Sequence, residues 1–284
     1  GSEMCIRDSH NGTTPTTGLT YGMRALLPAA LEYRDATNGA FDITIAPVMD
    51  AWGFTGDQFR VPKQSELNEL LKHVNSDEIQ VQEEPSYSVT LGEGQAIDLG
   101  GIAKGYTSDL VEQTFRANGI ESGKISLGGN VFVLGTKPDG SDWRVGIKDP
   151  RNESGLAAIL SLRDAYAITS GGYERYFEEN GKTYHHIIDP STGYPADSGL
   201  LSVTVVAADN GPDWAGAGNG AMCDAFSTAL FVMGEEQALD FWRNGGYDFD
   251  LVLVTEDGRV VITAGLADRF EEVKDSGYTY ETVS

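Results

Sequence analysis

Hydrophobic residues recur at helical spacing in four stretches of the chain, residues 21–37, 61–74, 108–119 and 223–246. In the first stretch the apolar side chains share one helical face, although Pro28 lies among them. In the second, Ser65 precedes the apolar positions and is expected to be the N-cap. Gly119 closes the third stretch, and the fourth is long enough for one or two helices.

Residues 78–82 and 86–91 alternate between apolar and polar positions like a hairpin. Further strands are predicted within residues 124–137, 142–150, 157–171, 175–190, 200–209 and 249–265. The last segment reads as a hairpin turned by Glu-Asp-Gly. Strands and helices do not alternate in a regular βαβ order. The pattern therefore predicts an α+β fold of mostly antiparallel sheets packed against helices.

The first nine residues, Gly-Ser-Glu-Met-Cys-Ile-Arg-Asp-Ser, contain no apolar core of a signal peptide. They resemble translated sequencing adapter, so residues 1–9 are expected to be a non-native leader. Residues 10–284 are then expected to form one domain. An export signal would be absent from this chain.

Composition narrows the classes of function. The chain has 284 residues with 43 acidic and 20 basic side chains, a net charge of −23. A nucleic-acid binder needs a basic face, so nucleic acid is excluded as a partner. The longest apolar runs have the length of strands, so no transmembrane segment is expected. The two cysteines, Cys5 and Cys223, form no metal or redox motif.

The stretch Ala96–Leu110, AIDLGGIAKGYTSDL, places one lysine among three glycines. Gly100, Gly101 and Gly105 bring the backbone close to any ligand, and Lys104 adds a cation. This combination suits an anion such as a phosphate. A tight strand-to-helix turn with a solvated lysine explains the same residues.

Two histidines adjoin each other in KTYHHIIDPSTGYP. His185 and His186 face opposite sides of a strand, so only one of them faces a given site. Histidine exchanges a proton near neutral pH. An ordinary pair of strand histidines is the alternative.

Asp224 and Thr228 are four residues apart and share one face of a predicted helix. A carboxylate and a hydroxyl are ligands for a hard cation such as Mg²⁺. Alternatively, Asp224 caps the helix or stabilises its first turn. Two more turns, at Gly128–Gly129 and around Ser170, allow a ligand to approach the backbone, and the first of them also fits a β-bulge.

Taken together, the chain resembles the ApbE family of flavin transferases. The resemblance rests on six segments in order, NGAFDITIAPVMDAWGF, AIDLGGIAKGYTSD, SLGGNVFVLGTKPDGSDWRVGIKDP, TSGGYERYF, HHIIDPSTGYP and DAFSTALFVMG, within residues 20–265. It implies Mg²⁺-dependent transfer of FMN from FAD to a Thr or Ser hydroxyl of an acceptor flavoprotein, with release of AMP. Alternatives on the same scaffold are an FAD pyrophosphatase and a non-catalytic flavin-binding protein. Many members are exported bacterial lipoproteins, which implies a periplasmic or exported location.

The resemblance also implies roles for single residues. Lys104 would lie at the FAD pyrophosphate and His186 at the reacting centre. The metal ligands would be the Ala103 carbonyl, Asp224 and Thr228. The flavin nucleotide pocket would be lined by Asp42, Gly128, Gly129, Asn130, Ser170, Gly171 and Gly172.

Three features depart from the family pattern. The N-terminal strands that usually precede the first segment are expected to be truncated. Acids common in the family are replaced by Asn130 and Gly172. An insertion, AADNGPDWAGAGNGAMCDAF, lengthens the approach to the helix that carries Asp224.

Overall fold

The computed structural model describes residues 16–17, 20–56, 58–209 and 216–284. The expected leader at residues 1–9 lies outside this part of the chain. Six α-helices are described, α1 (Tyr21–Ala36), α2 (Ala46–Trp52), α3 (Gln64–Leu70), α4 (Ala103–Ala117), α5 (Asn219–Met233) and α6 (Glu235–Asn244). None of the described helices is long and apolar enough to cross a membrane.

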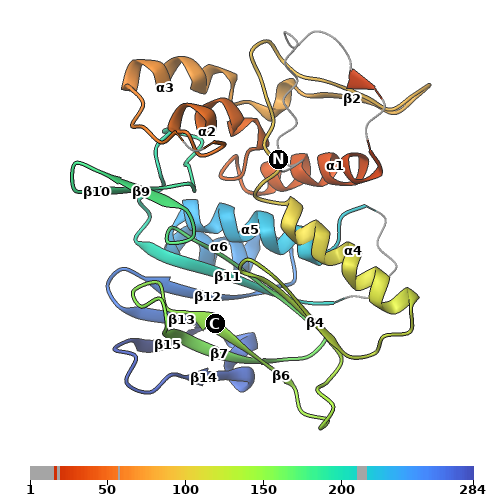
Figure 1. The fold of residues 1–284 in the computed structure, drawn as a ribbon, viewed down its shortest axis with the longest axis vertical. Coiled ribbons are helices and arrows are strands. Elements are labelled where there is room, and N and C mark those ends of the chain that lie inside the picture. The colour runs from red at the N-terminus through yellow and green to blue at the C-terminus, as the bar shows by residue number, and fades with distance from the viewer. Residues whose placement is uncertain (1–15, 18–19, 57, 210–215) are drawn as a thin grey trace.

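A seven-stranded sheet forms the centre of the molecule (Figure 1). Its strands, in spatial order, are β15 (Thr279–Val283), β13 (Arg259–Thr263), β12 (Asp250–Thr255), β11 (Leu200–Ala208), β8 (Ala165–Gly171), β5 (Asn130–Leu134) and β4 (Gly123–Leu127). All neighbours are antiparallel except β13 and β15. This arrangement confirms the predicted α+β class.

Three smaller sheets surround the central one. Their strands are β14 (Phe270–Glu272), β7 (Leu156–Leu162) and β6 (Trp143–Lys148); β1 (Thr16–Thr17), β3 (Ser88–Thr90) and β2 (Gln80–Gln82); and the pair β10 (Lys182–His185) and β9 (Tyr176–Glu179). The β9–β10 hairpin projects from the body beside α2 and α3 (Figure 1).

Alternating side chains of the central sheet supply two cores. On β12, Leu251 and Leu253 pack in the cluster that includes α1 and α5, whereas Val252 and Val254 pack against β6 and β7. The sheet is therefore sandwiched between helices and a second sheet. A third, smaller core lies under α2 and α3, around Trp52 and Phe54.

The observed helix boundaries correct three expectations. α3 has Lys63 rather than Ser65 as its N-cap, because the N–H groups of Glu66 and Leu67 already bond the Lys63 carbonyl. α5 begins at Asn219, so Asp224 lies in its second turn and does not cap it. α4 begins five residues earlier than the predicted 108–119 and so includes Lys104 in its first turn.

Two buried carboxylates connect helices α4 and α5, and each accepts hydrogen bonds from main-chain N–H groups at the start of the other helix. Asp109 of α4 accepts hydrogen bonds from the N–H groups of Gly218 (3.1 Å), Gly220 (2.7 Å) and Ala221 (3.0 Å), where α5 begins. Asp224 of α5 accepts one from the N–H of Gly105 (2.8 Å), in the first turn of α4. Each helix thus satisfies N–H groups at the start of the other, which otherwise have no intrahelical partner.

This crossing has no room for side chains at Gly105 and Gly220. A methyl group on Gly105 would lie 2.1 Å from the Gly220 carbonyl oxygen, and one on Gly220 would lie 2.5 Å from the Gly105 carbonyl oxygen. The two backbones are therefore in contact, and the carboxylates reach the opposite helix only because both residues are glycine.

We expect Gly105→Ala to lower the free energy of unfolding by about 1–3 kcal/mol, because the added methyl group forces the helices apart. Gly22→Ala, also near the start of a helix, is the matched control. Its methyl group would lie 3.4 Å from the nearest atom, an ordinary contact. Chemical denaturation of both variants checks this, and equal stabilities would contradict it.

Candidate functional site

A cavity of about 400 Å³ opens where the first turn of α4, the middle of α5 and the end of β8 meet. Its other walls are the segment that precedes α2 and the turn that follows β10. Six of the predicted site residues line it: Asp42, Lys104, Ser170, His186, Asp224 and Thr228. Five segments of the chain therefore converge on one hollow.

Lys104 supplies a cation at the N-terminal end of α4. Its Nζ donates a hydrogen bond to the Gly128 carbonyl (3.2 Å). Gly128 and Gly129 form the tight turn between β4 and β5, with φ of +52° and +92°. These two glycines do not line the cavity; the turn instead holds Lys104, whose charge adds to the positive end of the helix. The combination suits a phosphate.

Asp224, Thr228 and Ser170 form an oxygen-rich wall opposite the turn. The Ser170 hydroxyl lies 3.2 Å from the Thr228 hydroxyl and 2.8 Å from that of Ser227. Asp224 is only 3% exposed, and this burial raises the pKa of its carboxyl, an effect that Lys104 and the Gly105 N–H oppose. A buried carboxylate with a raised pKa gains from a nearby cation.

Asn130 lies beside this wall and is fully buried, and its side-chain amide opposes the rise in the pKa of Asp224, but neither polar atom of the amide makes a hydrogen bond of ordinary geometry. Buried amides are nearly always hydrogen-bonded in folded proteins. Asn130 does not line the cavity itself. Its amide therefore has unused hydrogen-bonding capacity close to Asp224.

These donors fit a hard cation. Carboxylate and hydroxyl oxygens are the ligands of Mg²⁺, which commonly binds through one or two carboxylates and completes its shell with water and substrate phosphates. No group of three His, Cys, Asp or Glu side chains suited to a metal occurs in the described residues. The described residues therefore contain no set of His and Cys ligands of the kind that binds zinc.

The carbonyl of Ala103 is the third metal ligand that the family resemblance implies. Ala103 begins α4, and its carbonyl accepts a hydrogen bond from the Thr107 hydroxyl (2.8 Å). Ala103 does not line the cavity. Its role as a ligand stays a prediction.

His186 is held by one main-chain group. The Arg175 carbonyl accepts hydrogen bonds from the His186 N–H (3.0 Å) and, on the same residue, from Nδ1 (3.1 Å). Since a carbonyl only accepts, Nδ1 carries the proton and Nε2 keeps its lone pair. Burial lowers the pKa of His186 to about 4, so the ring is neutral at pH 7.

His185 points to the other side of the strand, as the alternation predicted. Its Nε2 bonds the Ala196 carbonyl (3.1 Å), and its ring lies edge-on to Phe231. It lines a neighbouring hollow together with Gly172. Gly171 lines neither hollow. The structure therefore separates the two histidines, and places Gly172 away from Lys104 and Asp224.

Asp42 lies at the cavity wall, but its carboxylate is engaged in structure. Oδ1 accepts hydrogen bonds from the Thr44 N–H (2.8 Å), the Thr44 hydroxyl (2.5 Å) and the Ser76 hydroxyl (2.6 Å). Arg34 lies 3.7 Å from Oδ2. Asp42 caps the short 3₁₀ turn Ile43–Ile45 and so fixes the wall on which α2 begins.

Several lining residues were not found by sequence reasoning. Asp98 accepts a hydrogen bond from the Gly100 N–H (2.7 Å), and burial raises the pKa of its carboxyl, an effect that Arg175 opposes. Arg175 donates to the Gly56 carbonyl (3.2 Å) and brings a second cation to the cavity. Both residues lie inside segments that resemble the ApbE family. Their positions in the sequence do not indicate which other residues they contact.

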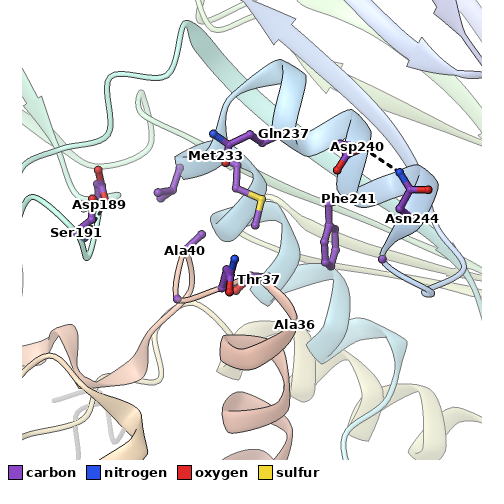
Figure 2. Close-up of a pocket in the computed structure, with 14 residues that line it drawn as sticks. Ala36, Thr37, Ala40, Asp189, Ser191, Met233, Gln237, Asp240, Phe241 and Asn244 are labelled. Atoms are coloured by element: carbon purple, nitrogen blue, oxygen red, sulfur yellow. Dashed lines mark hydrogen bonds between the residues drawn. The ribbon is translucent and has the colours of Figure 1, made fainter.

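A separate hollow of about 610 Å³ lies where α1, α5 and α6 end, beside the turn after β10 (Figure 2). Met233 and Phe241 line it together with Thr37, and Asn244 donates a hydrogen bond to Asp240 (2.9 Å). It contains none of the predicted site residues.

Comparison with known proteins agrees with this α+β architecture. The model of the ApbE family matches residues 7–251, and the chain belongs to that family. Two similar curated proteins are each named FAD:protein FMN transferase. The protein from Treponema pallidum is 32% identical, covering 99% of this chain and 78% of its own. That from Klebsiella pneumoniae is 35% identical, covering 88% and 73%.

Solved structures agree with the fold. The ApbE protein from Thermotoga maritima superposes with a TM-score of 0.77 at 34% identity, over 92% of this chain and 78% of its own. The flavin transferase ApbE from Vibrio cholerae superposes with a TM-score of 0.72 at 26% identity, over 95% and 79%. The predicted family is thereby confirmed.

We expect the imidazole of His186 to titrate with a midpoint near pH 4 when followed by NMR, because burial disfavours its charged form. An unfolded histidine titrates near 6.5, so between pH 6.5 and 4 the unfolded chain binds more protons. Stability should therefore decline as the pH falls through this window, and His186→Gln should make the decline shallower. A midpoint near 6.5 would contradict the assignment.

Proposed function

We propose that the protein transfers FMN from FAD to a Thr or Ser hydroxyl of an acceptor protein, releases AMP and requires Mg²⁺. One observation carries the proposal: a single cavity joins a phosphate-binding helix end with Lys104, an oxygen-rich wall with Asp224 and Thr228, and a neutral histidine, His186. The relatives named FAD:protein FMN transferase support the same chemistry.

In the proposed reaction, the acceptor hydroxyl oxygen attacks the phosphorus on the FMN side of the pyrophosphate. A new phosphorus–oxygen bond joins FMN to the acceptor, and the bond to the AMP phosphate breaks. AMP leaves with the electron pair of that bond. The acceptor loses one proton, so atoms and charge balance.

His186 would take the proton of the hydroxyl on Nε2. Its Nδ1–H is fixed to the Arg175 carbonyl, so the free lone pair belongs to Nε2. The lowered pKa keeps this nitrogen unprotonated at neutral pH. Positioned general bases contribute typically ~10²–10⁴ in rate.

Lys104 and the first turn of α4 would bind the pyrophosphate and offset its negative charge. Phosphoryl transfer depends mainly on positioning and charge stabilisation. Mg²⁺ held by Asp224 and Thr228 would add charge neutralisation at the phosphate oxygens. The Ser170 hydroxyl, 3.2 Å from Thr228, would orient that residue.

A second candidate is hydrolysis of FAD to FMN and AMP. The same neutral His186 can accept a proton from water as readily as from a hydroxyl, so the cavity alone does not choose between the two acceptors. A purely flavin-binding role leaves the neutral histidine and the oxygen-rich wall unused. Location as an exported lipoprotein stays a prediction.

One incubation separates these functions: the protein with FAD, Mg²⁺ and a protein domain that carries a flavinylation site. Transfer makes the acceptor fluorescent and increases its mass by FMN. Hydrolysis gives free FMN and AMP. Intact FAD that stays bound, with neither product, would overturn both enzymatic functions.

We expect His186→Ala to lower the rate of transfer by ~10²–10⁴ while FAD affinity stays within about twofold, because the ring serves the proton transfer. His185→Ala is the matched control and should lower the rate much less, since its ring lies in the neighbouring hollow. Rates at saturating FAD and saturating acceptor, together with FAD titrations, check both. A larger loss in His185→Ala would contradict the assignment.

We expect Asp224→Ala to abolish Mg²⁺-dependent turnover and also to lower the thermal midpoint. The variant loses the one charged metal donor of the wall and leaves the Gly105 N–H buried without its partner. Thr228→Val separates the effects, because Thr228 makes no bond to α4: it should weaken activation by Mg²⁺ with little loss of stability. Mg²⁺ titrations of turnover, with thermal melts, provide the measurement. Full Mg²⁺-dependent activity in Asp224→Ala would refute the metal role.

A further inference from the structure

A groove larger than the candidate active site lies on the other side of the β9–β10 hairpin. It encloses about 830 Å³, roughly twice the volume of the cavity with Lys104 and Asp224. Tyrosine is its most frequent aromatic lining residue, at Tyr173, Tyr176, Tyr184 and Tyr194. We call this hollow the hairpin groove.

Adjacent residues at the end of β10 line the groove and the cavity. In the hairpin, Tyr176 pairs with His185 and Glu178 pairs with Thr183, so these four side chains share one face and line the groove. The next residue of the chain, His186, lines the cavity instead. A molecule seated in the groove therefore lies against the strand that continues into the proposed base.

The hairpin also offers free main-chain groups. Within residues 58–209 and the other described ranges, β9 and β10 pair only with each other, so each strand has one edge without a strand partner. The hairpin projects from the body (Figure 1), and Tyr176, Glu178 and Thr183 on one of its faces are exposed. Its other face packs through Phe177 and Tyr184 against Trp52. Unpaired strand edges bind extended polypeptides by main-chain hydrogen bonds.

The charge of the groove argues against a nucleotide. Four carboxylate residues, Glu178, Asp189, Asp197 and Glu256, line it with one lysine, Lys182. A pyrophosphate would be repelled there, whereas a basic peptide segment would be attracted and a neutral one would not be repelled. Tyrosines give large contact area at a low cost in side-chain entropy, which favours protein contacts.

We propose that the hairpin groove docks an extended, neutral or basic segment of the acceptor protein, next to the hydroxyl that receives FMN. The inference rests on the proposed function and adds to it the surface that recognises the acceptor. FAD and the acceptor then approach the hairpin from opposite sides, with His186 at the strand end between them.

Tyr176→Ala tests the contact, since Tyr176 is 47% exposed and removal of its ring leaves the cores intact. Glu178→Lys tests the charge at an exposed position of the same face. Tyr21→Ala is the matched control, because Tyr21 is 77% exposed and lines none of the three hollows described. The probe is a protein domain that carries a flavinylation site.

We expect KM for the acceptor domain to rise about tenfold in Tyr176→Ala and in Glu178→Lys, the effect typical of one strong interface contact. FAD affinity and the rate of FAD hydrolysis without acceptor should stay at the wild-type value, as should all constants of Tyr21→Ala. Unchanged KM in both groove variants would overturn the proposal.

A direct binding measurement tests the docking site independently of the transfer reaction. If the wild-type protein transfers no FMN, the proposed function fails, and titration of the acceptor domain against the wild type and Glu178→Lys still decides the docking. Binding that Glu178→Lys weakens supports the groove. Absent binding, or equal binding to both proteins, overturns it.

Discussion

The contact between α4 and α5 is the constraint on which the site depends. Asp109 and Asp224 each satisfy N–H groups at the start of the opposite helix, and both carboxylates are buried. Such charge-assisted hydrogen bonds are stronger than neutral ones, and an unpaired carboxylate at this depth would be costly. Burial raises the pKa of Asp109 to about 7 in spite of its three N–H donors. The same contact sets Lys104 and Asp224 across from each other, so the fold and the site share their central interaction.

The contact between the two helices also positions three polar side chains of the site, because each lies within a turn of the contact or bonds a residue that does. Thr228 lies one turn after Asp224 on α5, and Ser170 reaches it from the neighbouring strand β8. Lys104 stands in the first turn of α4, one residue before the glycine that touches α5. His186 is the exception, because it comes from a hairpin outside the central sheet. Its orientation is set locally, by the Arg175 carbonyl.

Much of the fold could be read from the sequence, since period-3.6 and period-2 patterns report which face of an element is buried. Lys104, Asp224, Thr228 and His186 were found because their segments resemble a family. Tertiary contacts decided the rest. The turn at Gly128 holds Lys104 from 24 residues away, and Asp42 caps a 3₁₀ turn while bonding Ser76. Asp98 and Arg175 meet only in the folded chain, so no spacing could pair them.

The clamp on His186 is made of main chain alone. The Arg175 carbonyl is present whatever side chain occupies that position, so the tautomer of the histidine is insensitive to substitution there. The guanidinium of Arg175, which bonds Gly56, can therefore vary during evolution without changing the tautomer, although its positive charge helps to lower the pKa of His186. Among relatives, the residue at this position should therefore vary with the ligand that the cavity binds. The tautomer of His186 should depend only on the backbone conformation that places this carbonyl.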